Sequence, residues 1–233
     1  MTDIHQHLLW GLDDGAATPE IMQSMLREAH RQGIRTVMAT PHAQPGFRPF
    51  DMGLYRERLA EAQLFCKNEN LDVAVCSGAE IAWTFQTTLA LWQNQVPTLK
   101  DTDYVLLELW RDVSWQTAKD AVGQLNKAGF RPVLAHVERY LPFLLSPKAV
   151  MRFRQQTGAL IQVSADTVLN PRGFLERRFI RTMLEAQAID AIATDAHGCP
   201  GRPINLRAAY DLLATNTDET YARSVTSLGG VFT

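Results

Sequence analysis

Short apolar runs alternate along this chain with longer stretches in which apolar residues recur every three or four positions. The short runs are typical of strands buried on both faces, and the longer stretches are typical of amphipathic helices. Seven such pairs follow one another, which predicts a parallel α/β protein whose strands form a barrel. The predicted strands cover residues 2–7, 35–40, 73–79, 104–109, 132–136, 159–163 and 191–194.

Helix start and stop signals occur between these strands. Thr18 is placed to cap a first helix that has Pro19 at its first position and ends near Gly33. Gly129 and Gly158 stand where later helices give way to the next strand. Further helices are predicted at residues 52–68, 114–128, 147–157, 174–187 and 204–215, with a shorter one near 84–92.

Side chains that bind metals stand at the carboxyl ends of the predicted strands. In a β/α barrel these ends converge on one face, so residues far apart in the sequence are expected to meet there. The sixth predicted strand has no clear ligand, and His30, in the last turn of the first helix, is expected to be structural. The candidates in chain order are His5, His7, His42, Glu80, Glu108, His136, Asp195 and His197.

The spacing and chemistry of these residues favour a cluster of metal ions. His5 and His7 are two apart on a strand and therefore point to one face, where both can bind one ion. A set of imidazoles and carboxylates without thiolates suits Zn, Mn or Fe, and a carboxylate such as Glu80 can bridge two ions. The pattern therefore predicts a multinuclear site.

Composition narrows the class of protein. A chain of 233 residues with 46% apolar content predicts one domain over residues 1–233. The net charge of −2 gives no field that would hold nucleic acid, and no apolar run is long enough to span a bilayer, so we expect a cytoplasmic protein. Cys66, Cys76 and Cys199 lack CxxC spacing and are expected to be reduced thiols.

The same residues occur in blocks that run along almost the whole chain. These blocks are Asp3-Ile4-His5-Gln6-His7, Gly11-Leu12-Asp13-Asp14-Gly15, Ala39-Thr40-Pro41-His42, Gly78-Ala79-Glu80-Ile81, Ala135-His136-Val137-Glu138-Arg139-Tyr140, and Thr194-Asp195-Ala196-His197 followed by Gly201-Arg202-Pro203. Together they resemble the bacterial tyrosine phosphatases of the polymerase and histidinol phosphatase (PHP) superfamily, which accompany capsule and exopolysaccharide synthesis.

The resemblance implies a distorted seven-stranded (β/α)7 TIM-like barrel of the PHP fold, with two or three divalent metal ions. Manganese is expected, with zinc or iron as alternatives. It also implies that Arg139 and Arg202 bind the phosphate. The implied ligand sets are His5, His7, Glu80 and Asp195 for the first ion, Glu80, Glu108 and His136 for the second, and Asp14, His42 and His197 for the third.

The implied reaction is hydrolysis of a phosphate monoester. Water bound to such a cluster has its pKa lowered to about 7, which supplies hydroxide at neutral pH. The expected substrate is a phosphotyrosine protein, such as a bacterial tyrosine kinase that regulates exopolysaccharide synthesis. A thiolate mechanism is excluded because no cysteine is followed six positions later by arginine.

Three alternatives stay open. A small-molecule phosphatase, such as histidinol phosphate phosphatase, would use the same cluster. A metal amidohydrolase would carry a bridging lysine on the fourth strand, where this chain has Glu108. A non-catalytic scaffold would keep the metal for stability alone, although a structural site needs only four closed ligands. The sequence leaves the oligomeric state and any general acid undetermined.

Overall fold

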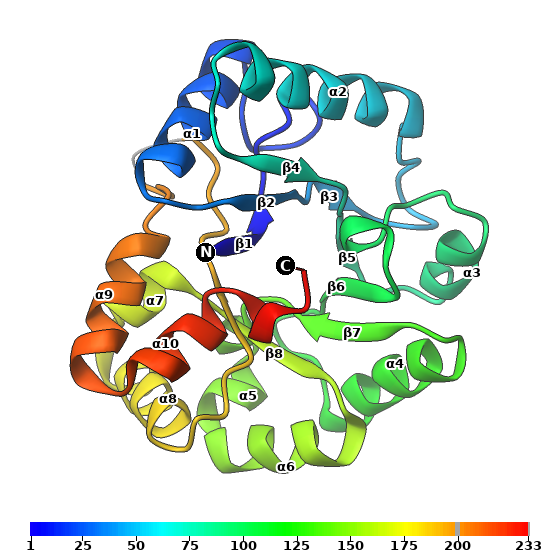
Figure 1. Ribbon diagram of the computed structural model, residues 1–233. Coiled ribbons are helices and arrows are strands. Elements are labelled where there is room, and N and C mark those ends of the chain that lie inside the picture. Colours follow the sequence, from blue (N-terminus) through cyan, green and yellow to red (C-terminus); the bar gives the residue numbers. More distant parts are fainter. Residues whose placement is uncertain (199–200, 233) are drawn as a thin grey trace.

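Short parallel strands curl around the centre of the molecule, and helices cover their outer side (Figure 1). This is a computed structural model, and it describes residues 1–198 and 201–232. The strands are β1 (Thr2–Gln6), β2 (Thr36–Ala39), β3 (His42–Ala43), β4 (Ala74–Cys76), β5 (Glu80–Ala82), β6 (Tyr104–Glu108), β7 (Arg131–Leu134), β8 (Leu160–Ser164) and β9 (Ala191–Ala193).

Parallel pairing runs through two sheets whose ends meet. The strand orders are β1-β2-β4 and β3-β5-β6-β7-β8-β9. The Asp195 amide donates to the His5 carbonyl at 2.8 Å, and the His7 amide donates to the Ala196 carbonyl at 2.9 Å. The first strand therefore lies beside the segment that follows the last one. The predicted α/β fold with a curled parallel sheet is confirmed, and the carboxyl ends of the strands gather at one end of it.

The predicted count of seven strands is not confirmed, because two of the predicted strands, at residues 35–40 and 73–79, are each followed by a further short strand. Pro41 separates β2 from β3 and has no N–H to donate to a sheet. Gly78 separates β4 from β5, and its amide donates to the Tyr55 hydroxyl at 2.9 Å instead of to a neighbouring strand. The described residues consequently contain nine short strands.

The helices that were predicted are all present within a few residues of the expected bounds. The Thr18 hydroxyl accepts a hydrogen bond from the Ile21 amide at the start of α1, as the capping signal predicts. Gly129 and Gly158 have φ values of 90° and 72°, which few other residues adopt. These helices are α1 (Pro19–Arg31), α2 (Met52–Asn68), α3 (Thr87–Trp92), α4 (Trp115–Lys127), α6 (Pro147–Thr157), α8 (Gly173–Glu185) and α9 (Leu206–Asn216).

Three further helices were not predicted: α5 (Leu141–Leu145), α7 (Ala165–Leu169) and α10 (Glu219–Val225). Each has seven residues or fewer, which is too short for a helical period to stand out in the sequence. In the part of the chain that the structure describes, no helix is both long enough and apolar enough to cross a bilayer.

The interior of the curled sheet is apolar at the amino ends of the strands. Ile4, Met38 and Leu106 pack there against Leu228 and Phe232 from the end of the chain. Figure 1 shows this last segment returning to the centre of the ring of strands. Apolar side chains therefore fill this end of the sheet, and polar side chains lie at the opposite end.

Two of the three cysteines can be placed. Cys66 is buried and Cys76 is half-buried, and neither is in a disulfide. Burial raises the pKa of the Cys66 thiol to about 11, and burial also raises that of Cys76. Both are therefore protonated at neutral pH, as expected of small apolar side chains. Cys199 lies outside the described residues.

Candidate metal centre

Strand β1 delivers His5 and His7 to the carboxyl end of the sheet. Its pairing with β2 slips between Asp3 and Gln6, and such irregularities re-aim side chains. The Nε2 atoms of His5 and His7 lie 3.2 Å apart and are fully buried. Two nitrogen ligands of one tetrahedral ion, each bound at about 2.0–2.1 Å, are separated by roughly 3.3 Å. The observed spacing fits a shared ion.

Glu80, the first residue of β5, lies at the centre of the site. Its Oε2 is 3.2 Å from Nε2 of both His5 and His7, and 3.0 Å from Nδ1 of His42. Its Oε1 is 2.6 Å from Nε2 of His136. Burial by itself raises the pKa of this carboxyl, but the imidazoles, His5 and His136 above all, hold it well below its usual range. Its two oxygens face different imidazoles, the arrangement required of a bridging carboxylate.

Asp195 follows β9 and has a φ of 53°, a conformation that is uncommon for a residue other than glycine. Its Oδ1 lies 3.3 Å from Nε2 of both His5 and His7. This buried oxygen accepts no hydrogen bond from the described residues. A buried carboxylate oxygen without a donor is unfavourable, and a cation at this position would satisfy it. The donor set of His5, His7, Glu80 and Asp195 therefore fits a metal ion.

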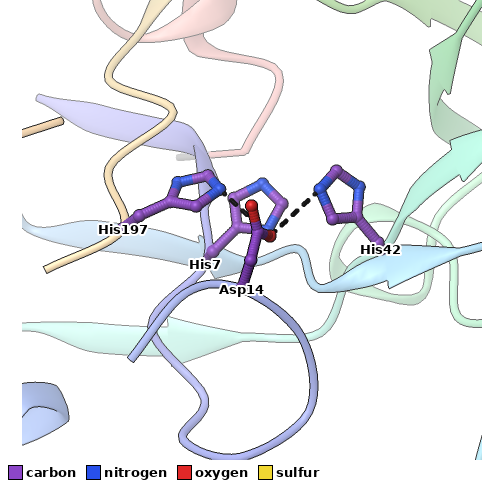
Figure 2. Close-up of side chains that lie close together, drawn as sticks. All are labelled: His7, Asp14, His42 and His197. Carbon is purple, nitrogen blue, oxygen red and sulfur yellow. Dashed lines mark ion pairs between the residues drawn. The ribbon is translucent and has the colours of Figure 1, made fainter. Parts of the chain in front are cut away.

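A second group lies on the more exposed side of His7 (Figure 2). Asp14 Oδ1 is 3.3 Å from Nε2 of His42 and 3.4 Å from Nε2 of His197. The Asp14 side chain is 65% exposed, so solvent reaches this group. Burial, together with His7 and Arg202, lowers the pKa of His197 to about 4. His197 is therefore neutral at neutral pH, which is the form that binds metals.

Glu108, at the end of β6, forms a third group with Glu80 and His42, whose ligand atoms all lie within 4.8 Å of one another. Burial, followed by the charge of Glu80, raises the pKa of the Glu108 carboxyl. His136 was expected in this group, and its Nε2 lies 3.8 Å from Glu108 Oε1. It sits at a φ of 31° and is much closer to Glu80. His42, which was assigned to the third ion, is thus also close to Glu80 and Glu108 of the second predicted set.

Both arginines predicted to bind phosphate reach the same carboxylate. Arg139, at the end of a short 3-10 helix after β7, and Arg202 each donate through Nη2 to Asp195 Oδ2 at 2.5 Å. Arg202 Nη1 also contacts His197 Nε2. Their side chains are 45% and 32% exposed and line a cavity of about 630 Å³. One oxygen of Asp195 therefore faces the histidines, and the other faces the arginines and the cavity.

Asp13 is a site residue that sequence reasoning missed. Its Oδ2 is 2.7 Å from His7 Nδ1 and accepts the His42 amide at 2.9 Å, while its Oδ1 accepts the Gly15 amide at 2.9 Å. Burial by itself raises the pKa of the Asp13 carboxyl, but the hydrogen bond from His7 and the charge of His7 lower this pKa to about 2. Asp13 and Asp14 are adjacent in the sequence, but only Asp14 was predicted to be a metal ligand. A Cβ at Gly15 would lie 2.1 Å from the His7 carbonyl, so the loop approaches the backbone after β1 too closely for any other residue.

Strand β8, which lacks a predicted ligand, places Gln162 beside the cluster. Its Oε1 accepts the His136 amide at 2.7 Å and lies 3.3 Å from His5 Nδ1. A carbonyl oxygen at that position favours the tautomer of His5 that carries its proton on Nδ1, which leaves Nε2 free for a metal. A glutamine inside an apolar strand is the signal that could have identified it.

His30 lies apart from the cluster, and its Nδ1 accepts a hydrogen bond from the Asp72 amide at 3.0 Å. The prediction that it is structural agrees with this contact. The eight candidate ligands at strand ends do converge at one end of the sheet, and Asp14 joins them.

The fold is an α/β fold with a curled parallel sheet, and imidazoles and carboxylates gather at the carboxyl ends of its strands. These features define a barrel-like protein with a candidate metal-binding site. The family model for capsular polysaccharide synthesis, CpsB/CapC, matches residues 1–228. This chain belongs to that family.

Two named relatives and one crystal structure are similar to this chain. The chain is 30% identical over 219 residues to the tyrosine-protein phosphatase CpsB of Streptococcus pneumoniae, covering 92% of this chain and 90% of that protein. It is 30% identical over 213 residues to the tyrosine-protein phosphatase YwqE of Bacillus subtilis strain 168, covering 91% and 84%. A crystal structure from work on YwqE and CpsB, described as unique metal-dependent tyrosine phosphatases, aligns with a TM-score of 0.87 at 28% identity, covering 97% of this chain and 91% of the other.

These comparisons confirm the predicted family, and with it the predicted class of metal-dependent tyrosine phosphatases.

Proposed function

We propose that this chain hydrolyses phosphotyrosine in a protein substrate and uses two or three divalent metal ions to do so. The observation that carries the proposal is the overlap of three groups of ligand atoms, each group lying within 4.8 Å. His7, His42 and Glu80 each belong to two groups. A neutral histidine binds one ion, so among these three residues it is the Glu80 carboxylate that can bridge adjacent ions.

The proposed ligands are spread along the chain from His5 to His197. His5, His7, Glu80 and Asp195 would hold one ion, Glu80, Glu108 and His136 a second, and Asp14, His42 and His197 a third. Manganese is the expected metal, with zinc or iron as alternatives. When bound, such ions supply an activated water and neutralise charge on the phosphoryl oxygens.

Arg139 and Arg202 would bind the phosphoryl group from the cavity side. Their guanidinium groups are already held toward the cluster by Asp195 Oδ2. A guanidinium offers paired donors that match phosphoryl oxygens. A phenolate leaving group has a pKa near 10, so it needs less protonation than an alkoxide does. These two side chains are the catalytic residues of the proposal.

The physiological part of the proposal follows from the family. The substrate would be a phosphotyrosine protein, such as a bacterial tyrosine kinase of exopolysaccharide synthesis, in the cytoplasm. The chain would act as one domain over residues 1–233. Its sheet would have seven barrel positions, with β2 and β3 sharing one and β4 and β5 sharing another, because each pair is separated by only two or three residues.

The test combines metal analysis with a choice of substrates. Purified protein loaded with manganese should contain two or three ions per chain and hydrolyse a tyrosine-phosphorylated peptide. A chelator should abolish this activity, whereas iodoacetamide should leave it intact because no thiol takes part. Faster hydrolysis of histidinol phosphate would favour the small-molecule alternative. Two bound ions without any phosphatase activity would point to a scaffold.

A further inference from the structure

Two hollows adjoin the cluster, and Glu108 is a lining residue of each. The first has a volume of about 630 Å³ and holds Arg139 and Arg202, and the second has about 860 Å³ and holds Asp14 and His42. Glu108 lines both, so the two hollows meet at this residue. Each has the size of an entire small-molecule pocket, and together they exceed what one phosphotyrosine side chain fills.

The loops that border the two hollows carry the same pair of residue types. Phe47 and Arg48 follow β3, and Trp110 and Arg111 follow β6. Phe47 is 71% exposed and Trp110 is 60% exposed. Arg48 lines the second hollow and Arg111 the first. Exposed aromatic residues beside arginine are enriched where proteins bind other proteins.

Neither Arg48 nor Arg111 makes a side-chain ion pair or hydrogen bond within residues 1–198 and 201–232. Their backbones are nonetheless held in place: the Arg48 amide donates to the Gln44 carbonyl at 3.0 Å, and the Arg111 carbonyl accepts the Leu141 amide at 2.7 Å. A backbone hydrogen bond therefore anchors each loop at its arginine, and both arginines are exposed to solvent.

Carboxylates at the edges of the hollows already have partners. Asp51 caps α2 by accepting the Gly53 and Leu54 amides at 3.0 and 2.9 Å. Asp166 lies 3.5 Å from Arg172, whose amide donates to Glu176. Among the described charged side chains that line the hollows, Arg48 and Arg111 are thus the two without an ion pair or hydrogen bond, and the ligands that complement them are acidic.

We propose that the two hollows form one track that binds an extended, acidic segment of the substrate protein on both sides of its phosphotyrosine. Phe47 with Arg48 and Trp110 with Arg111 are the residues that select this segment. The inference rests on the proposed function, because the phosphotyrosine must enter the first hollow beside Arg139 and Arg202. Carboxylates of the segment pair with Arg48 and Arg111, and its apolar parts contact the two aromatic rings.

The experiment compares two phosphotyrosine peptides of equal length, one with aspartate and glutamate around the tyrosine and one with asparagine and glutamine. Free phosphotyrosine is the third substrate, and manganese-loaded full-length protein is used throughout. The readout is the ratio of kcat/KM for the acidic peptide to that for the neutral peptide. We expect the ratio to be about 10 at low salt and to fall as salt screens the charges.

Charge reversal locates the source of the preference. Arg48→Glu and Arg111→Glu should each lower the ratio several-fold, and the double variant should bring it to about 1 or below. Lysine at either position should retain most of the preference because it keeps the charge. Arg152→Glu is the matched control, since Arg152 is exposed on α6 away from both hollows. A ratio within each variant is insensitive to differences in folding or metal loading.

The outcomes separate this inference from the proposed function. Hydrolysis of free phosphotyrosine with equal kcat/KM for the two peptides would overturn the track and leave the function standing. A preference for the acidic peptide that survives both charge reversals would show that these arginines do not select it. Failure to hydrolyse any of the three substrates would overturn the proposed function and the track with it.

Discussion

The two ends of the curled sheet bury side chains of opposite character. At the amino ends of the strands, Met38, Leu106 and Phe232 form an apolar interior. At the carboxyl ends, His5 and Glu80 are buried to the same extent but carry polar groups. Burying an apolar side chain stabilises a protein by roughly 1.5–3 kcal/mol, whereas burying a charged group is unfavourable unless it is paired. One end therefore supports the fold, and the other holds groups that need a partner.

The comparison explains how the polar end is tolerated. Glu80 is surrounded by imidazoles, and Asp195 has a histidine-facing oxygen and an arginine-facing oxygen. Oxygen atoms of Asp13 and Gln162 accept hydrogen bonds from Nδ1 of His7 and His5 and so hold the two imidazoles in place. A bound metal would add stability by mass action, because the unfolded chain does not form the site. Four sets of variants test whether one end of the sheet stabilises the fold and the other binds metal and substrate. They follow in descending order of their expected effect on catalysis.

The largest effect is expected for Glu80→Ala, because this carboxylate contacts histidines of every proposed ligand set. Metal content should fall, and kcat/KM should drop by at least about 1000-fold, equivalent to roughly 4 kcal/mol. Metal analysis and kinetics on the same preparation test this. Glu80→Gln keeps the size of the side chain, so loss of metal in both variants attributes the effect to the missing charge. Full metal content in Glu80→Ala would show that the bridging role is wrong.

The next largest effect is expected for Arg139→Ala and Arg202→Ala. Each should lose about 2–4 kcal/mol of transition-state stabilisation, or roughly 30- to 1000-fold in kcat/KM. Metal content should stay intact because neither side chain is a proposed ligand. Arg35→Ala is the control, since Arg35 pairs with Asp72 at 3.1 Å at the amino ends of the strands. Near wild-type turnover in both site variants would contradict phosphate binding by these arginines.

A smaller effect is expected for Asp13→Asn, which removes the charge that orients His7 and keeps the shape of the side chain. Carboxylates behind metal-bound histidines typically contribute about 10- to 100-fold in metal affinity. The affinity should therefore weaken by that factor, measured by competition with a metal-sensitive dye. Asp211→Asn, on the surface of α9, is the matched control. An unchanged affinity would mean that Asp13 serves only to hold the loop.

The smallest catalytic effect, and the clearest effect on stability, is expected at the opposite end. Phe232→Ala empties part of the apolar interior and should lower the free energy of unfolding by about 3 kcal/mol. Urea unfolding measures this change. Activity per folded molecule and metal content should stay near wild type because Phe232 is remote from the ligands. A loss of metal affinity in this variant would show that the two ends are not separable.

The sequence predicted much of the fold because hydrophobic periodicity is a local property. Predicted helix bounds at residues 52–68 and 147–157 agree with α2 and α6. The count of seven strands is not confirmed, and of its two breaks the one at Gly78 depends on a distant contact. Nothing local to Gly78 indicates that its amide pairs with Tyr55, which lies 23 residues away.

The candidate site was predictable for a different reason. Residues that follow parallel strands gather at one end of the sheet whatever the details of packing, so strand-end residues such as His5, Glu80 and His136 were identifiable. Asp14 came from family resemblance. The division of ligands into sets was less predictable, because the distance of His42 from Glu108 and the closer contact of His136 with Glu80 depend on backbone angles that only the folded chain fixes.

The sequence by itself determined the alternation of strands with the longer helices, the metal-ligand residue types and the family. These follow from residue types and local spacing, which exist before the chain folds. Only the tertiary structure decided that Asp13 and Gln162 orient His7 and His5, that Asp195 links the histidines to both arginines, and that Arg48 and Arg111 border adjoining hollows. Each of these relations joins side chains distant in sequence or depends on the direction of a single hydrogen bond, and a periodic pattern carries no information about either.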